Sequence, residues 1–174
     1  MSEQVEQFAD LVDDFCGSDF TWASKAEDRT ALWSMRHNAY YACLALRKGA
    51  VAVVTDAYVP ISELADQVQA AADDIAASTL IGPILGHVGD GNFHSALLIE
   101  PGNDMELAEA KRLAHRMAER ALEVGGTVTG EHGIGIGKKN FMPREHGQAG
   151  WEAMGAVKAA LDPKGILNPD KLVP

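Results

Sequence analysis

Residues Gly86–His94 read Gly-His-Val-Gly-Asp-Gly-Asn-Phe-His, and the prediction for the surrounding chain starts from them. Asp-Gly between two apolar runs predicts a two-residue turn that joins two antiparallel strands. With Asp90 and Gly91 at the turn, His87 lies directly opposite His94. Opposed residues share one face of the ribbon, with Cβ atoms about 4.5–5.5 Å apart, so both imidazoles can reach one metal ion. The hairpin therefore predicts half of a metal site, and two satisfied core histidines are the alternative.

A second segment, Gly130–Gly137, places a carboxylate next to an imidazole at Glu131 and His132. The glycines around them leave room for a backbone or a ligand to approach closely. Two histidines and one glutamate with an open coordination position are typical of a catalytic divalent metal site rather than a structural one. The two segments together predict such a site if the fold brings them together.

Apolar periodicity and turn residues predict the elements around these segments. We expect helices up to Gly17, at residues 24–46, at about 64–75, from Asn103 or Asp104 to Gly125, and at 148–161, and strands at 50–56, 80–87, 93–99 and 127–130. The order strand–helix–strand–strand–helix–strand over residues 50–131 is that of a ferredoxin-like split βαβ unit. The sequence therefore predicts an α+β fold with a four-stranded antiparallel sheet, flanked by N- and C-terminal helices.

This order divides the chain into a helical segment at residues 1–49, a ferredoxin-like subdomain at 50–131, and a glycine loop, helix and tail at 132–174. Both hairpin arms are apolar on both sides, so the sheet face without helices needs a cover. A missing domain, a tight partner or the helix at 24–46 could supply it. In the simplest ferredoxin-like sheet, Glu131 lies far from His87 unless the strand at 127–130 is very short.

The composition is ordinary for a globular protein, with 174 residues, 47% apolar and 23% charged. A formal net charge of −10 argues against nucleic acid or an anionic membrane as the main partner. Cys16 and Cys43 form no C-x-x-C motif, so we expect reduced thiols. The sequence shows no apolar run long enough to span a membrane and no signal peptide. We therefore expect a cytoplasmic location, at most peripheral to a membrane.

Five motifs resemble the C-terminal domain of the FAD-linked oxidases of the vanillyl-alcohol oxidase superfamily, and most nearly the D-lactate dehydrogenase (cytochrome) branch. The motifs are Leu32–Ala39, Thr55–Pro60, Gly86–His94, Thr129–Lys138, and Leu161–Gly165 with Asn168–Pro169. The resemblance implies two ferredoxin-like halves after a flavin-binding domain, with this chain holding the second half. We therefore expect part of a longer protein that binds FAD mainly through its other domain, and no activity from this part alone.

The resemblance also implies roles for individual residues. The residues that resemble ligands of a divalent metal (Zn, Mn or Fe) are His87, His94 and Glu131. His132 resembles the general base, and Arg36 resembles the group that binds the substrate carboxylate. Asn168 resembles a polar contact to the flavin.

The expected reaction is oxidation of a 2-hydroxy acid, which removes a proton from the hydroxyl and a hydride from the α-carbon. A metal acts as a Lewis acid, an imidazole takes the proton, and flavin accepts the hydride. Relatives that oxidise 2-hydroxyglutarate carry Asn and Lys where this chain has Ala96 and Val54. The departure favours a small 2-hydroxy acid as the substrate.

Two other classes stay open. One is a non-catalytic ferredoxin-like module for metal binding or dimerisation, and the other is a metal-dependent hydrolase that would act without flavin. No G-x-G-x-x-G follows a strand, so a nicotinamide-binding fold is not indicated. Because the face expected to meet the flavin domain is uncovered, we expect homo-oligomers. Lys138 and Lys139 are expected to be solvated charges after the loop.

Overall fold

The structure is a computed structural model that describes residues 2–17 and 20–173. It divides into two compact units, Met1–Ala42 and Cys43–Pro174, and each is described by itself. The first unit holds α1 (Ser2–Asp14), α2 (Ala26–His37) and the start of α3 (Ala39–Ala45). None of the side chains that the structure describes in this unit is buried. The single helix expected at residues 24–46 is wrong, since the chain leaves helical geometry at Asn38 (φ −91°, ψ 0°) before α3 begins.

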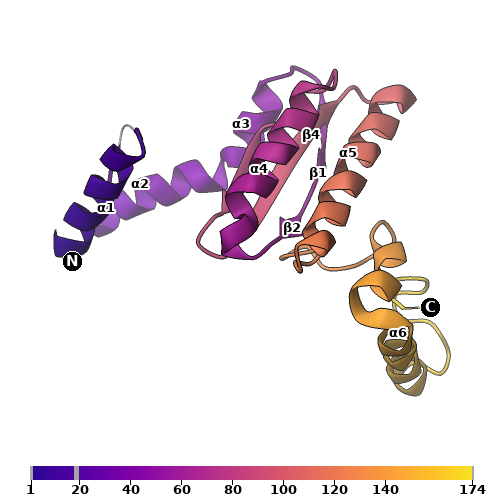
Figure 1. Ribbon diagram of the computed structural model, residues 1–174. Helices are drawn as coiled ribbons and strands as arrows, with labels where there is room; N and C mark the ends of the chain where they lie inside the picture. Colours follow the sequence, from indigo (N-terminus) through magenta and orange to yellow (C-terminus); the bar gives the residue numbers. More distant parts are fainter. Residues whose placement is uncertain (1, 18–19, 174) are drawn as a thin grey trace. The chain divides into compact units, whose positions relative to one another are not determined.

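The second unit contains the sheet. Its elements are β1 (Val51–Val54), β2 (Ala57–Tyr58), α4 (Ile61–Ala76), β3 (Ile84–His87), β4 (Asn92–Ile99), α5 (Asp104–Glu123), the 3-10 helix η1 (Lys139–Phe141) and α6 (Met142–Leu161) (Figure 1). β4 lies at the centre, with β1 and β2 on one edge and β3 on the other, all antiparallel to it. The predicted α+β class with a four-stranded antiparallel sheet is confirmed.

The strands are not all the predicted ones. Residues 127–130 form no strand, and only an isolated bridge joins Thr127 to Tyr58. The fourth strand arises instead because the predicted strand at 50–56 is assigned as two pieces, β1 and β2, with Thr55 and Asp56 between them. A strand at 127–130 would have carried Glu131 away from His87. Because the pairing stops at Thr127, the chain turns away at once and this difficulty does not arise.

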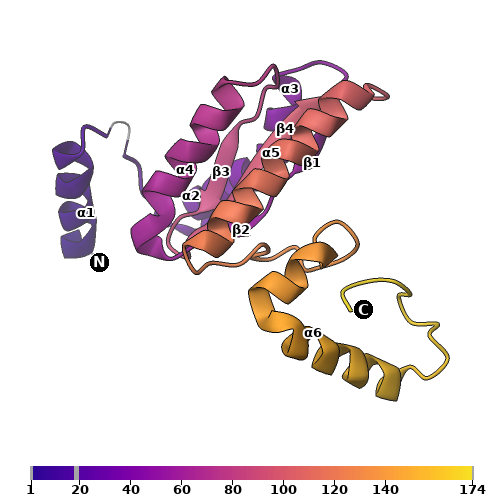
Figure 2. The same ribbon diagram turned by 45° about the vertical axis from the view of Figure 1, so that its right-hand side comes forward.

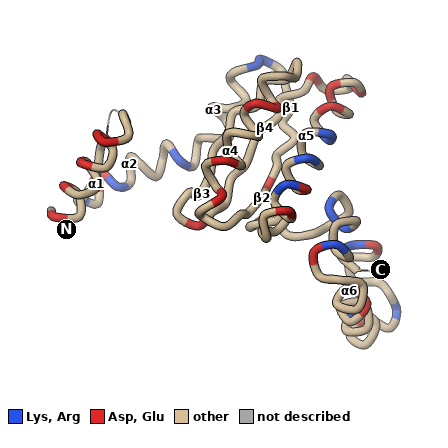
Figure 3. Tube along the Cα trace, in the orientation of Figure 1, with Lys and Arg blue, Asp and Glu red and all other residues tan. Residues whose placement is uncertain are grey.

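α4 and α5 pack side by side on one face of the sheet (Figure 2). The core between them is apolar and includes Phe93, Leu97, Ile99, Leu113 and Met117. α4 carries acidic charges only, whereas α5 carries both signs (Figure 3). Arg116 and Arg120 of α5 pair with Asp74 of α4, at 3.0 Å and 2.5 Å. Burial and these ion pairs both hold the helices to the same face, as the sequence predicted.

β1 and β2 keep one register against β4. Val54 pairs with Ala96 and Ala57 with Phe93, so the two intervening residues on each strand also lie opposite each other. The backbone N–H of Thr55 donates to Ser95 O at 2.9 Å, as in an unbroken ladder. Ser95 N, however, donates to the Thr55 hydroxyl rather than to its carbonyl, at 2.7 Å. The interruption is therefore one diverted hydrogen bond, not a bulge.

The connection between β3 and β4 is longer than the Asp-Gly turn predicted from the sequence. His87 pairs with Asn92, and Leu85 pairs with His94, so four residues form the turn. The N–H of Asp90 donates to His87 O at 2.8 Å, and Gly91 follows with φ +82°. The predicted opposition of the two histidines is wrong. They lie diagonally instead, and a shift of two places keeps both side chains on one face.

The chain from Thr129 to Lys138, which we call the site loop, follows the Thr127 bridge. It is anchored by a small apolar cluster in which Val128 and Phe141 pack with Ala118 of α5. α6 begins before the predicted residue 148 because a first helical turn precedes Gly147, whose φ of +74° interrupts the helix.

Candidate functional site

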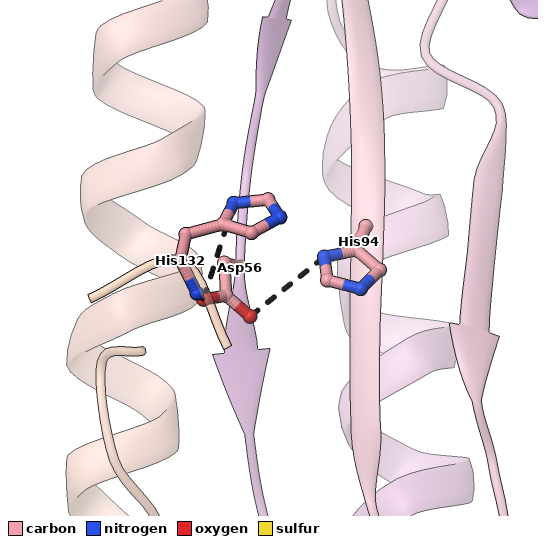
Figure 4. A group of neighbouring side chains, drawn as sticks. All are labelled: Asp56, His94 and His132. Carbon is pink, nitrogen blue, oxygen red and sulfur yellow. Dashed lines mark hydrogen bonds and ion pairs between the residues drawn. The ribbon is translucent and has the colours of Figure 1, made fainter. Parts of the chain in front are cut away.

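Five polar side chains meet on the sheet face opposite α4 and α5. Asp56 lies between β1 and β2, His87 ends β3, and His94 lies within β4. Glu131 and His132 come from the site loop. By register, Asp56 is directly opposite His94, and Figure 4 shows its carboxylate beside the rings of His94 and His132, with an ion pair to each. Three segments that are far apart in the sequence therefore supply one cluster.

His94 is held in one tautomer. Its Nδ1 lies 3.1 Å from the carbonyl oxygen of Thr55, the same carbonyl that the sheet ladder leaves without Ser95 N. Because a carbonyl oxygen only accepts, this contact places the proton of a neutral ring on Nδ1. The lone pair is then on Nε2, on the far side of the ring. The diverted ladder bond thus prepares His94 to be a ligand through Nε2.

The Glu131 carboxylate faces three imidazoles. Its Oε1 lies 3.2 Å from His94 Nε2, 3.7 Å from His87 Nε2 and 3.7 Å from His132 Nε2. Ligand atoms held tetrahedrally at about 2.1 Å from one ion are about 3.4 Å apart, so the spacing fits a divalent cation. A carboxylate oxygen and the lone pair of His94 repel each other unless a proton or a cation lies between them.

Buried polar atoms without a hydrogen-bond partner concentrate here. Among the residues that the structure describes, four such side-chain atoms occur, and three belong to this face: Asp56 Oδ1, Asn92 Oδ1 and His94 Nε2. Buried polar groups are normally paired, and unpaired ones mark an ion, a water or a catalytic role. All three atoms are acceptors, which is what a cation requires.

Asp56 is ionised by its surroundings. Burial raises the pKa of its carboxyl, but the backbone N–H groups of His132, Glu131 and Gly130 and the Thr129 hydroxyl outweigh burial and lower the pKa to about 2. Its side chain is only 1% exposed. A negative charge is therefore fixed beneath the cluster.

Within residues 2–17 and 20–173, two sets of three residues come close enough to hold an ion, Asp56–His94–His132 and His87–His94–Glu131. In the first set, Asp56 Oδ2 already accepts three hydrogen bonds and His94 Nδ1 faces Thr55 O, so that only Oδ1 of this carboxylate has no hydrogen-bond partner. The second set offers Nε2 of His94, which has no hydrogen-bond partner. The second set, which is the one indicated by the sequence, therefore fits a metal better.

His132 lies against His94 with the rings stacked, 5.0 Å between centroids and 15° between planes. Its side chain is 44% exposed, and that of Glu131 is 49% exposed. His87 is 32% exposed, whereas His94 is 5% exposed. His132 thus lies beside His94 on the solvent side of the cluster.

The sequence also singled out Arg36 and Asn168. Arg36 belongs to the first unit, where it is exposed on α2. Asn168 lies in the tail after α6 with φ +44°. It lines a cavity of about 590 Å³ together with apolar residues such as Met154 and Leu161, not the histidine cluster.

Sequence reasoning missed three contributors. Asp56 and Asn92 were not proposed as site residues, and Lys138 was expected to be a solvated charge. The structure contradicts the expectation for Lys138, which is partly buried and donates to the carbonyls of Asp56 and Val128. A charged residue ending an otherwise apolar strand was the available signal for Asp56.

Comparison with known proteins decides the family. The family model of FAD linked oxidases, C-terminal domain, matches residues 1–172. The chain belongs to this family. A probable mitochondrial D-lactate dehydrogenase from Danio rerio is 43% identical over 173 residues, which cover 99% of the chain and 35% of that protein. The mitochondrial D-lactate dehydrogenase [cytochrome] of Arabidopsis thaliana is 38% identical over 172 residues, covering 99% and 30%.

The FAD-linked oxidase domain is also similar to a bacterial protein. The glycolate oxidase subunit GlcD of Bacillus subtilis is 37% identical over 150 residues, covering 86% of the chain and 32% of that protein. The chain thus spans about a third of the length of these relatives. The two D-lactate dehydrogenases are named as mitochondrial, whereas the sequence favoured a cytoplasmic location. None of the helices that the structure describes is long and apolar enough to cross a bilayer.

Proposed function

We propose that this FAD-linked oxidase domain binds a divalent metal and a small 2-hydroxy acid, and contributes to oxidising that acid to the 2-oxo acid. The observation that carries the proposal is the convergence of His87 Nε2 and the partnerless His94 Nε2 on the Glu131 carboxylate. The D-lactate dehydrogenases and the glycolate oxidase subunit, by their names, act on such acids. FAD, bound mainly by another domain of the same protein, would supply the hydride acceptor, and the metal would supply a Lewis acid.

In this proposal, each of the six site residues indicated by the sequence has a defined role. His87, His94 and Glu131 hold the metal, with Zn, Mn and Fe all compatible with nitrogen and carboxylate ligands. His132 takes the proton of the substrate hydroxyl, since the free nitrogen of a neutral imidazole can accept a proton. Arg36 binds the substrate carboxylate with its planar guanidinium, and Asn168 contacts the flavin.

The residues next to the cluster support a small substrate. Val54 and Ala96 are paired directly across β1 and β4, two residues from Asp56 and His94 and on the same face. Neither side chain carries a charge that could bind a second carboxylate. A substrate such as D-lactate, with one carboxylate and a methyl group, suits these neighbours better than a dicarboxylate.

Metal analysis of the purified 174-residue chain tests the proposal. We expect about one Zn²⁺ or Mn²⁺ per chain, and loss of at least 100-fold in affinity for His87→Ala and His94→Ala, because each variant removes one of three ligands. His146→Ala, which removes an exposed histidine of α6, is the control and should bind like the parent chain.

Absence of metal above background in the parent chain would contradict the metal site and favour the non-catalytic module. Turnover of a substrate by the loaded chain without flavin would favour the hydrolase. Binding that survives His94→Ala would show that the ion lies elsewhere.

A further inference from the structure

Both ends of the site loop are attached to Asp56, which lies between β1 and β2. Oδ2 of Asp56 accepts hydrogen bonds from His132 N at 2.8 Å, from Glu131 N at 3.1 Å and from the Thr129 hydroxyl at 2.9 Å. The backbone carbonyl of Asp56 accepts one from Lys138 Nζ at 2.6 Å. The loop therefore starts and finishes on Asp56, 73 to 82 residues away in the sequence.

The other contacts of the loop are few. Gly133 O accepts from the Thr129 hydroxyl at 3.3 Å, Gly135 O accepts from Leu172 N at 3.2 Å, and Ile134 packs against the apolar cluster of Val128 and Phe141. The loop belongs to no strand, and Gly133, Gly135 and Gly137 have open space where a Cβ would be. Glycine loses more conformational freedom on ordering than any other residue. A backbone of this kind takes one conformation only where other groups fix it. Here the donors of Thr129, Glu131 and His132 all point to the buried carboxylate of Asp56.

Asp56 is in turn fixed by the sheet. It lies in register opposite His94, and its side chain is almost completely buried. Any group attached to Asp56 is therefore fixed relative to His94. Through the loop, this places Glu131 Oε1 at 3.2 Å from His94 Nε2 and the His132 ring parallel to the His94 ring.

We propose that Asp56 is a positioning residue, and that together with Lys138 it holds the site loop so that Glu131 and His132 face the sheet histidines. This inference rests on the roles proposed above for Glu131 and His132. Lys138 completes the attachment, because its ammonium donates to the carbonyl of Val128 as well as to that of Asp56. Asp56 acts through the two loop residues and is not itself a ligand.

Asp56→Asn tests the inference in the 174-residue chain, since it keeps the size of the side chain and weakens its acceptor. Without metal, we expect faster amide hydrogen exchange at Glu131 and His132 by NMR, with exchange in β4 unchanged. With Zn²⁺ alone as the probe, calorimetry should show a 10- to 100-fold loss of affinity, the usual effect of removing a group that orients ligands.

The matched control is Asp162→Asn. Asp162 is also buried and also accepts two backbone N–H groups, from Ile166 and Leu167, but it holds the tail after α6. This variant should leave Zn²⁺ affinity and exchange at Glu131 and His132 unchanged. Equal effects of the two variants would overturn the inference.

One uncharged variant and one matched pair of lysine variants separate position from charge. Thr129→Val removes one donor to Asp56 without changing any charge, and it should weaken Zn²⁺ binding about fivefold, as one hydrogen bond does. Lys138→Met should act in the same direction. Lys139→Met, which removes an adjacent lysine for which no side-chain hydrogen bond occurs among the described residues, should have no effect. If Asp56→Asn fails to fold, these single-contact variants decide the matter.

The outcomes also distinguish this inference from the proposed function. If Glu131→Gln leaves Zn²⁺ affinity unchanged, or if the parent chain binds no Zn²⁺, the proposed metal site is wrong. The amide hydrogen exchange at Glu131 and His132 then decides by itself whether Asp56 holds the loop. If Glu131→Gln weakens binding but Asp56→Asn, Thr129→Val and Lys138→Met do not, the metal site stands and the positioning role is wrong.

Discussion

Asp56, at the sheet, and Asp162, after α6, are both buried and both accept hydrogen bonds from the backbone of a loop. Asp56 holds the site loop through Glu131 N and His132 N. Asp162 holds the tail through Ile166 N at 3.1 Å and Leu167 N at 2.9 Å, and it also accepts from Lys158. The same device therefore orders two loops in one unit.

The surroundings of the two carboxylates differ. Around Asp56 lie the imidazoles of His94 and His132. The buried side-chain atoms without a hydrogen-bond partner among the described residues include Asp56 Oδ1 and His94 Nε2 but no atom of Asp162. Around Asp162 lie the apolar residues of the α6 cavity and the amine of Lys158. A buried carboxylate alone thus indicates an ordered loop. A group of buried acceptors without hydrogen-bond partners indicates a candidate functional site.

The largest difference between the two regions should appear in catalysis. Under the proposed function, in a longer protein that also carries a flavin-binding domain, we expect His132→Ala to lower kcat about 10²- to 10⁴-fold, the usual contribution of a general base. Steady-state kinetics with D-lactate, together with the visible flavin spectrum, measures this.

His146→Ala, which removes an exposed imidazole near the start of α6, is the control and should keep full activity. Loss of flavin together with activity in His132→Ala would show that His132 supports the cofactor rather than the proton transfer.

The next effect concerns stability. Leu97 of β4 is completely buried in the core, whereas Leu161 of α6 is 77% exposed. Leu97→Ala should lower the free energy of unfolding by about 2–5 kcal/mol, because it removes buried apolar surface and leaves a cavity. Leu161→Ala should change it by less than about 0.5 kcal/mol. Denaturant titration measures both, and a large effect at Leu161 would mean that α6 has a partner in solution.

The smallest effect is pH-dependent. Hydrogen bonds from Lys158 and from the backbone N–H of Leu167 lower the pKa of Asp162 despite its burial. A carboxyl whose pKa is lower in the folded state stabilises the fold above its ordinary pKa, and this stabilisation is lost as the pH falls through the lowered value.

Asp162→Asn should therefore reduce Tm at pH 7 by less than Leu97→Ala does. The difference in Tm between Asp162→Asn and the parent chain should shrink towards zero as the pH falls below 4. Thermal unfolding followed by circular dichroism from pH 7 to pH 3 checks this, and a difference that persists in acid would show that Asp162 acts by shape alone.

Much of the second unit was predictable because its signals are local. Apolar periodicity gave the helix from Asn103, whose side chain caps α5 by accepting from Glu106 N at 3.2 Å. The predicted strand arms contain β3 and β4. The register was wrong because Asp90-Gly91 was taken as the whole turn, although Val88 and Gly89 also belong to it. The histidines still share a face because the error was an even number of residues.

The parts that were not predictable depend on contacts across the sequence. The sequence around Asp56 does not predict that its carboxylate accepts hydrogen bonds from residues 129–132. It also does not predict that Lys138 donates to the backbone carbonyl of Asp56. The carbonyl of Thr55 fixes the tautomer of His94 because Ser95 N donates to the Thr55 hydroxyl instead. This exchange of partners depends on the pairing of the chain around Thr55 with β4, which the sequence does not show. Motif spacing could therefore indicate the ligands, but not the groups that orient them.

The graded exposure of the cluster sets a route and an order for binding. His94 is the deep member, and Glu131 and His132 form the rim that meets solvent. An incoming ion or chelator therefore encounters the rim first and the deep imidazole last. For the proposed metal, the rates of loading and unloading should therefore depend on how fast the exposed rim residues of the loop release the ion.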